Sequence, residues 1–283
     1  MVRKPAVSGY FYPSERETLQ TMVKTMLTEE MKEVVQKHLQ GVNGIIGVVS
    51  PHAGYMYSGK IAAYSFYALS LSPPVETVVI IGPNHRGVGA KVALGGEDFW
   101  QTPLGSVALD REAIDFLVGH DPVFRVDSEA HRLEHSLEVQ LPFLQCFLSY
   151  DFKVVPIVLI KQDPVTARII AEALKKLGEH RKLCIVASSD FSHYEQAGVA
   201  AEKDSALIAR ILSLDVDGFY EEIYARGISV CGPGGIAVLM EYYQNISRNK
   251  RGSLLAYAHS GEVTGDIDRV VGYASIIFPK FSP

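Results

Sequence analysis

Three histidines each lie at or near the end of an apolar run with the composition of a buried strand. The runs and their polar tips are residues 45–49 with His52, residues 78–81 with His85, and residues 183–187 with Asp190 and His193. Short β-branched runs predict strands covered on both faces, as in a largely parallel sheet. Because the carboxyl ends of such strands meet at one edge, where open α/β sheets bind ligands, we expect the tips to converge. Converging histidines indicate a metal site.

Cys231 lies in the glycine-rich segment 230–235, directly before an apolar helix. There the helix dipole and free amides are expected to lower the pKa of the thiol and favour the thiolate, a soft metal ligand. Two alternatives stay open. Cys231 could be a small buried residue at a glycine-rich helix start, or the turn could bind a phosphate or carboxylate through its amides.

Each histidine tip also has a structural interpretation. His52 alone could be a turn residue hydrogen-bonded to the backbone. Asp190 and His193, three residues apart, could be a helix N-cap and a surface histidine. As chemistry, the same pair offers a carboxylate and a base.

Residues 131–135 fit the H-x-x-E-H pattern of inverted zinc metallopeptidases, in which one helix presents both histidines to zinc. Residues 134–136, however, are expected to open a helix that runs to residue 147. His131 would then fall in the preceding loop, which disfavours a peptidase. His135 at the head of that helix could equally be a hydrogen-bonded cap.

Composition excludes several classes of protein. The chain has 283 residues, a net charge of −5, 47% hydrophobic and 21% charged residues, which is typical of a globular protein without attraction to nucleic acid or anionic membranes. No apolar stretch reaches the roughly 18 residues of a membrane span, and the N-terminus lacks a signal-peptide core. The three cysteines are widely spaced, which favours a reducing compartment over a disulfide framework. We therefore expect a cytoplasmic protein.

Apolar runs alternate with segments of helical period, and no linker interrupts them. This order predicts one α/β domain over residues 1–283. The predicted helices are residues 15–40, 61–71, 111–118 and 134–147, one that opens at Asp163 and Pro164, and residues 200–212, 216–225 and 235–243. The predicted strands end at residue 49, begin at residue 78, span 91–94, 106–109 and 153–159, end at residue 189, and span 254–258 and 270–277.

Six ordered motifs resemble the Memo family, which is related in fold to the class III extradiol ring-cleavage dioxygenases. They are residues 3–13, 51–55, 82–85, 134–138, 188–194 and 231–232. The resemblance covers nearly the whole chain. It implies a central, mostly parallel or mixed sheet flanked by helices, with a cleft at one edge.

The resemblance also implies roles for six residues. His52, His85 and Cys231 would occupy the metal-ligand positions, with Asp190 close by, while His193 would be the acid/base residue and His135 a substrate contact. The dioxygenases hold ferrous iron with two histidines and a glutamate, whereas Cys231 stands at the carboxylate position here. A thiolate favours softer ions such as Cu(I), so the implied cofactor is iron(II) or copper.

Two functions follow from this resemblance. One is a metal-dependent oxidoreductase that acts on a small aromatic or other reduced organic molecule. The other is a metal-handling or peptide-binding module without turnover. Animal members of the family are associated with phosphotyrosine peptides and with copper or iron handling, and microbial members with a radical S-adenosylmethionine protein. The chain shows no arginine cluster that would define a phosphotyrosine pocket.

Overall fold

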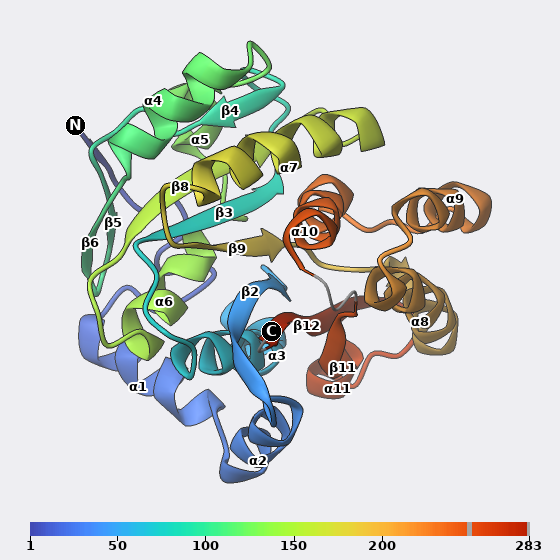
Figure 1. The fold of residues 1–283 in the computed structure, drawn as a ribbon. Helices are drawn as coiled ribbons and strands as arrows, with labels where there is room; N and C mark the ends of the chain where they lie inside the picture. Colours follow the sequence, from blue (N-terminus) through green and yellow to red (C-terminus); the bar gives the residue numbers. More distant parts are fainter. Residues whose placement is uncertain (248–250, 282–283) are drawn as a thin grey trace.

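A nine-stranded mixed sheet forms the centre of the fold (Figure 1). The computed structural model describes residues 1–247 and 251–281, so residues 248–250 and 282–283 of the predicted domain lie outside it. The strand order is β10-β12-β2-β9-β3-β8-β4-β7, and β11 also pairs with β12. The strands are β2 (Val42–Ser50), β3 (Thr77–Pro83), β4 (Val92–Leu94), β7 (Arg125–Val126), β8 (Lys153–Leu159), β9 (Leu183–Ser188), β10 (His193–Glu195), β11 (Ser253–His259) and β12 (Val270–Phe281).

The four central strands β2, β9, β3 and β8 are parallel, and antiparallel strands flank them. In register, Val48 of β2 lies opposite Val186 of β9, and Cys184 of β9 lies opposite Val78 of β3. β-Branched side chains fit a sheet covered on both faces, which explains why these runs form its middle. The predicted α/β class with a mostly parallel or mixed sheet is confirmed.

The first strand of the chain belongs to a second, three-stranded sheet that the sequence pattern did not predict in full. Its strands are β1 (Val2–Arg3), β5 (Phe99–Thr102) and β6 (Gly105–Ala108). Only β6 was expected, because two to four residues are too few for an alternating pattern to be recognised.

Helices cover the sheet in two groups (Figure 1). In one, α7 and α10 pack together and α10 contacts β9, β3 and β2, while in the other α3 contacts β2 and β12 together with α1, α2 and α6. The helices are α1 (Arg16–Met26), α2 (Glu29–His38), α3 (Tyr55–Ser70), α4 (Arg111–His120), α5 (Ser128–Arg132), α6 (Leu141–Phe147), α7 (Pro164–Gly178), α8 (Ala197–Ser213), α9 (Val216–Arg226), α10 (Pro233–Ile246) and α11 (Gly261–Thr264), with a 3-10 helix at Glu138–Gln140.

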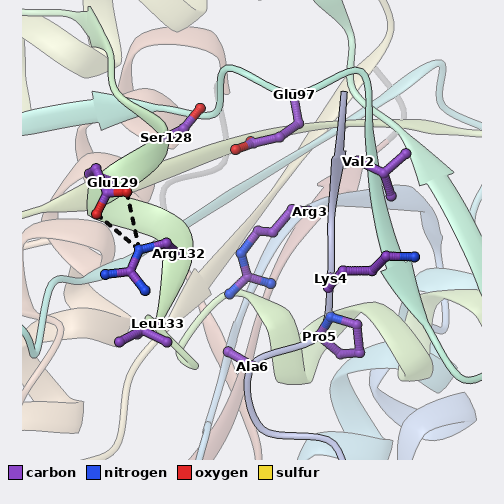
Figure 2. A pocket seen from close by; sticks show the side chains of 10 residues that line it. All are labelled: Val2, Arg3, Lys4, Pro5, Ala6, Glu97, Ser128, Glu129, Arg132 and Leu133. Atoms are coloured by element: carbon purple, nitrogen blue, oxygen red, sulfur yellow. Dashed lines mark hydrogen bonds and ion pairs between the residues drawn. The ribbon is translucent and has the colours of Figure 1, made fainter.

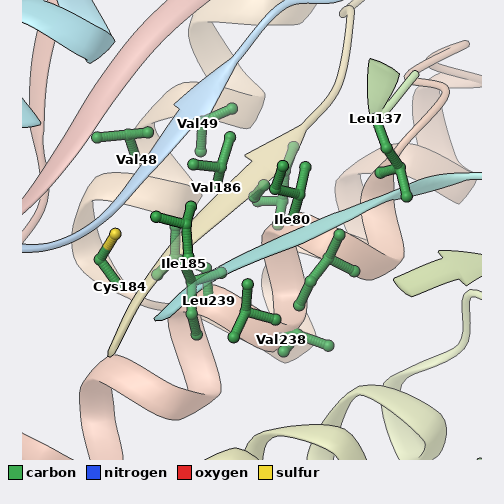
Figure 3. Packing of buried hydrophobic residues seen from close by; sticks show 14 of the residues in the cluster. Val48, Val49, Ile80, Leu137, Cys184, Ile185, Val186, Val238 and Leu239 are labelled. Carbon is green, nitrogen blue, oxygen red and sulfur yellow. The ribbon is translucent and has the colours of Figure 1, made fainter. Parts of the chain in front are cut away.

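The packing of α10 on the sheet forms part of the hydrophobic core (Figure 3). Leu239 of α10 lies beside Ile185 of β9, and both side chains are fully buried. Gly47 of β2 permits this close approach, because a Cβ at that position would lie 2.4 Å from a methyl carbon of Leu239. Tight packing here fixes the start of α10 relative to the strand ends.

Three predicted helices are wrong in extent. The helix expected over residues 61–71 begins earlier, at Tyr55. The helix expected over residues 15–40 is broken into α1 and α2, because the Thr28 side chain accepts a hydrogen bond from the Met31 amide and caps a new helix. The helix expected from residue 134 begins only with the 3-10 turn at Glu138. The Glu134 carboxylate binds the amides of His135 and Ser136, and this local hydrogen bonding holds a turn instead of a helix.

No helix in the part of the chain that the structure describes is long and apolar enough to cross a membrane.

A buried ion pair connects the N-terminal segment to the 3-10 helix at Glu138–Gln140. Arg3 and Glu138 are 5% and 0% exposed, and Arg3 Nη1 lies 2.7 Å from Glu138 Oε2. Glu138 also accepts hydrogen bonds from the amides of Ala6 and Val7 and from the Tyr12 hydroxyl. Arg3 donates further to the carbonyls of His131 and Glu134. Figure 2 shows the Arg3 side chain extending from β1 toward α5.

We expect Arg3→Met to lower the free energy of unfolding by about 3–5 kcal/mol, because it leaves the Glu138 charge buried without its partner. Urea unfolding monitored by circular dichroism measures this change. The matched control is Lys176→Met, which removes the exposed ion pair with Glu179 and should cost less than about 1 kcal/mol. Equal effects of the two substitutions would contradict the assignment of Arg3 as the anchor of the N-terminal segment.

Candidate metal centre

The ends of three parallel strands bring the predicted residues together. His52 follows β2, His85 follows β3 and Asp190 follows β9, while Cys231 comes from the segment before α10. The ligand atoms of His52, His85 and Cys231 all lie within 4.8 Å of one another, and His52 Nε2 lies 3.1 Å from Cys231 Sγ. His52 is buried, Cys231 is half-buried, and His85 is the most exposed of the three.

A glycine allows Cys231 to reach the strand ends. A Cβ on Gly232 would lie 2.5 Å from the Ser188 carbonyl oxygen, so only glycine fits there. The Gly232 amide donates to Ser189 Oγ and the Gly234 amide to Gln162 Oε1. Because both donors are engaged, these two amides are not free for the phosphate-binding alternative.

Glu134 orients His85. Its Oε1 lies 2.9 Å from His85 Nδ1, and its Oε2 accepts the His85 amide. Burial alone would raise the pKa of Glu134, but the hydrogen bond and charge of His85, the charge of His135 and the Ser136 amide lower that pKa to about 2. The ionised carboxylate only accepts, so His85 Nδ1 carries a proton, and in the neutral ring the lone pair is then on Nε2.

A second set of potential ligands, His85, Glu134 and His135, also lies within 4.8 Å. The Glu134 oxygens are already taken by the His85 ring and by the amides of His85, His135 and Ser136. A metal ion would have to displace these donors. We therefore assign Glu134 to orientation of His85 and not to ligation.

Burial dominates the electrostatics of the site. Burial, followed by the charges of His135, His85 and His193, lowers the pKa of His52 well below its usual range, so its imidazole is neutral. Burial raises the pKa of Asp190 to about 6. Burial and the Asp190 charge also raise the pKa of Cys231, so the expected lowering by the helix start is wrong. Ionisation of this thiol requires a nearby cation, which a bound metal supplies.

Asp190 contacts the ligand candidates, and His193 is near enough for its charge to act on His52 and Asp190. Asp190 Oδ1 accepts the His52 amide at 2.8 Å, and Oδ2 lies 4.0 Å from His52 Nε2. His193 is half-buried at the start of β10, and its Nδ1 lies 2.8 Å from the Ser229 carbonyl oxygen. A carbonyl only accepts, so Nδ1 carries the proton and Nε2 can accept another. Asp190 is buried at the strand end and caps no helix.

His135 lies against the same cluster, but in a turn and not on a helix. Its ring stacks on His85 at a centroid distance of 4.6 Å and packs against Phe11 at 4.6 Å. Burial, with the charges of His85 and Arg86, outweighs the opposing charge of Glu134 and lowers the pKa of His135 to about 4. The His135 ring is therefore neutral near pH 7 and lines one side of the site.

The H-x-x-E-H segment does not form a peptidase site. His131 is fully buried on α5, where Nε2 lies 3.1 Å from the Ala93 carbonyl oxygen and the ring packs on Trp100 at 5.3 Å. The expected places of the two histidines are thus reversed, since His131 is helical and His135 is not. Within the motif, His131 is structural, Glu134 orients His85, and His135 lies at the candidate metal centre.

A cavity of about 390 Å³ lies elsewhere, between the N-terminal segment and α5 (Figure 2). Its arginines are already paired, Arg3 with Glu138 and Arg132 with Glu129. Both arginine charges are thus balanced by carboxylates, and Lys4, which also lines the cavity, donates to the Gln101 side chain. We assign this cavity no function.

Several residues that shape the site were not predicted. Ser188 and Gln140 are fully buried beside His52, and Ser229 holds His193. The sequence offers one signal for such residues, which is an isolated polar residue inside an apolar run, such as Gln140 between Val139 and Leu141. A buried amide requires hydrogen-bond partners, so a residue of this kind is a candidate for a buried hydrogen-bond network.

The donor set fits a transition-metal ion. Two imidazole nitrogens and a sulfur at bond lengths of 2.0–2.3 Å around a tetrahedral ion lie roughly 3.5 Å apart, comparable to the separations here. Nitrogen and soft sulfur donors suit iron, copper or zinc better than magnesium or calcium. Three protein ligands would leave the fourth tetrahedral position for a small molecule.

Comparison with known proteins reveals relatives over almost the entire chain. A family profile described as "Memo-like protein" matches residues 3–277. A "MEMO1 family protein" from Nitrosopumilus maritimus is 42% identical over 98% of this chain and 100% of its own length, and one from Methanosarcina barkeri is 43% identical over 98% and 99%. The crystal structure of an uncharacterized Escherichia coli K12 protein matches with a TM-score of 0.53 at 12% identity, over 83% of this chain and 99% of that one, and shows a shared fold.

The burial of His131 is expected to make the stability of the folded protein depend on pH. Burial, with the charge of Arg3, lowers its pKa to about 4, below the usual 6.5 of the unfolded chain. The stability it contributes is complete above pH 6.5 and is lost as the pH falls towards 4, because only the unfolded state takes up the proton.

When the pH falls from 7 to 5, we expect proton uptake by His131 in the unfolded state to lower the free energy of unfolding by about 2 kcal/mol. Urea unfolding of the wild type and of His131→Gln at both pH values measures the difference. His131→Gln should lose less stability over this interval than the wild type by that amount. The same loss in both proteins would show that His131 titrates normally when folded.

Proposed function

The chain belongs to the Memo-like protein family, as its motifs predict, and on that premise we propose that it is a metal-dependent oxidoreductase. Its metal ion would be iron(II) or copper held by His52, His85 and Cys231. The observation that carries the proposal is the approach of these three ligand atoms to within 4.8 Å of one another at the ends of the parallel strands. A bound redox-active ion would supply electron transfer and an open coordination position for a small molecule.

The protein's own residues would handle binding and protons. Asp190 places a carboxylate 4.0 Å from His52 Nε2 and so favours a cation in the cluster. His193, held through Nδ1 by Ser229, would take a proton from the substrate at Nε2 and later return it. His135, stacked on His85, would form the wall against which the substrate lies.

The substrate in this proposal is a small aromatic or other reduced organic molecule. The protein would act in the cytoplasm, with a radical S-adenosylmethionine protein as a partner.

Metal handling without turnover is the second candidate, and one observation favours it. The third ligand is a cysteine where the related dioxygenases have a carboxylate, and sulfur donors select Cu(I). The metal that the protein carries distinguishes the two functions.

We expect protein purified without oxygen to contain close to one iron per chain, and His52→Ala/Cys231→Ala to contain almost none. Elemental analysis of iron and copper measures this. The control is His180→Ala/Cys146→Ala, which also removes one histidine and one cysteine but leaves the cluster intact. Copper alone, lost in the first variant only, would favour metal handling, and no metal in the wild type would contradict both functions.

We expect His193→Gln to keep its metal and to lose turnover by about 10²–10⁴-fold, because an amide accepts no proton at neutral pH. Oxygen uptake with a panel of catechols and small thiols measures turnover. His180→Gln, at an exposed position, should behave like the wild type. Full turnover in His193→Gln would remove His193 from the mechanism.

A further inference from the structure

We propose that Ser188 is a positioning residue that holds His52 in the tautomer protonated on Nδ1, which leaves the Nε2 lone pair for the metal ion. Ser136 and Gln140 fix the direction of the Ser188 hydroxyl. The inference about the tautomer stands on contacts within the chain, and its value for metal binding rests on the proposed function.

The Ser188 hydroxyl lies among three hydrogen-bonding neighbours. Its Oγ is 2.6 Å from the Ser136 carbonyl oxygen, 2.9 Å from Gln140 Nε2 and 2.9 Å from His52 Nδ1. Ser136, Gln140 and Ser188 are fully buried, and His52 is 2% exposed. Water therefore has little access to these groups, and each must be satisfied by the others.

The chemistry of the neighbours decides which atom donates. A hydroxyl has one proton and two acceptor lone pairs. The Ser136 carbonyl only accepts, so at the shortest contact it takes the Ser188 proton. The Gln140 amide nitrogen only donates, so it fills one lone pair. The remaining lone pair faces His52, and the hydrogen bond forms only if His52 Nδ1 carries a proton.

The orientation of Gln140 is fixed in the same way. Its Nε2 also lies 3.0 Å from the Pro51 carbonyl oxygen, which only accepts. Rotation of the amide by 180° would place its oxygen against that carbonyl. Among the described residues, Gln140 Oε1 has no partner. The amide thus leaves its own oxygen unsatisfied while its nitrogen binds both Pro51 and Ser188, which shows how strongly the surroundings require a donor.

Ser188 matters because the other tautomer of His52 has acceptors within reach. His52 Nε2 lies 3.1 Å from Cys231 Sγ and 4.0 Å from Asp190 Oδ2. A proton on Nε2 would be stabilised by these groups and would block metal binding. Ser188 opposes this by offering an acceptor to Nδ1.

One short segment thereby orients both histidines. Glu134 binds His85 Nδ1 directly, while Ser136 and Gln140 act on His52 through Ser188. In the regular helix that the sequence predicts, these groups would lie elsewhere. The Glu134 carboxylate, the Ser136 carbonyl and the Gln140 amide could then not bind His85 and Ser188 as they do here.

The tautomer of His52 is measured directly by correlation of ring nitrogens with carbon-bound ring protons in ¹⁵N-histidine-labelled, metal-free, reduced protein. We expect the Nδ1-protonated pattern in the wild type, assigned by its loss in His52→Ala. A pattern protonated on Nε2 would overturn the proposal, whether or not any variant folds.

In Ser188→Ala we expect His52 to change mainly to the Nε2-protonated tautomer, and anaerobic titration with iron(II) to give a dissociation constant raised by about 10–100-fold. The control is Ser65→Ala, which removes another fully buried hydroxyl bonded to a carbonyl oxygen, that of Val49, and should leave the tautomer unchanged. An unchanged tautomer in Ser188→Ala would overturn the proposal. If the tautomer responds as expected but wild-type protein binds no iron(II) or copper, the positioning role stands and the proposed function fails.

Discussion

The site depends on one constraint, which is the parallel alignment of adjacent strands at the centre of the sheet. β2, β9 and β3 are neighbours and run in the same direction, so the residues that follow them emerge at one edge. This places His52, Asp190 and His85 together although they are far apart in the sequence. Cys231 joins them because α10 packs on the same strands and Gly232 allows its start to touch the end of β9.

The requirement that buried polar groups be satisfied then shapes everything around this edge. Segment 134–140 forms a turn followed by a 3-10 helix, and not a regular α-helix, because Glu134 binds the amides of His135 and Ser136. In the same segment, Glu138 pairs with Arg3 and accepts hydrogen bonds from the backbone of the N-terminal segment. The N-terminus is thus part of the support of the site, and Phe11 reaches the ring of His135.

The chemistry of the site follows from its hydrogen bonds more than from the presence of histidines. His85 and His193 donate through Nδ1 to Glu134 and to the Ser229 carbonyl, and the geometry assigns the same tautomer to His52. All three rings therefore keep a lone pair on Nε2. Two of them approach Cys231, whose sulfur is a softer donor than a carboxylate, so the identity of the metal would distinguish the proposed oxidoreductase from the proposed metal-handling function.

The sequence by itself determined the parallel centre of the fold and the set of residues at its edge, because β-branched runs followed by polar tips carry that information locally. It also predicted the start of α7, where Asp163 caps the helix and Pro164 begins it. Only the tertiary structure decided that His131 is structural, that burial raises the pKa of Cys231, and that Glu134, Ser188 and Gln140 orient the histidines. The short strands β1, β5, β7 and β10 also depend on their partners. In each case the residues that bury or hydrogen-bond the group are distant in the chain, so no local sequence pattern reveals them. Burial, too, is decided only when the helices and strands pack together.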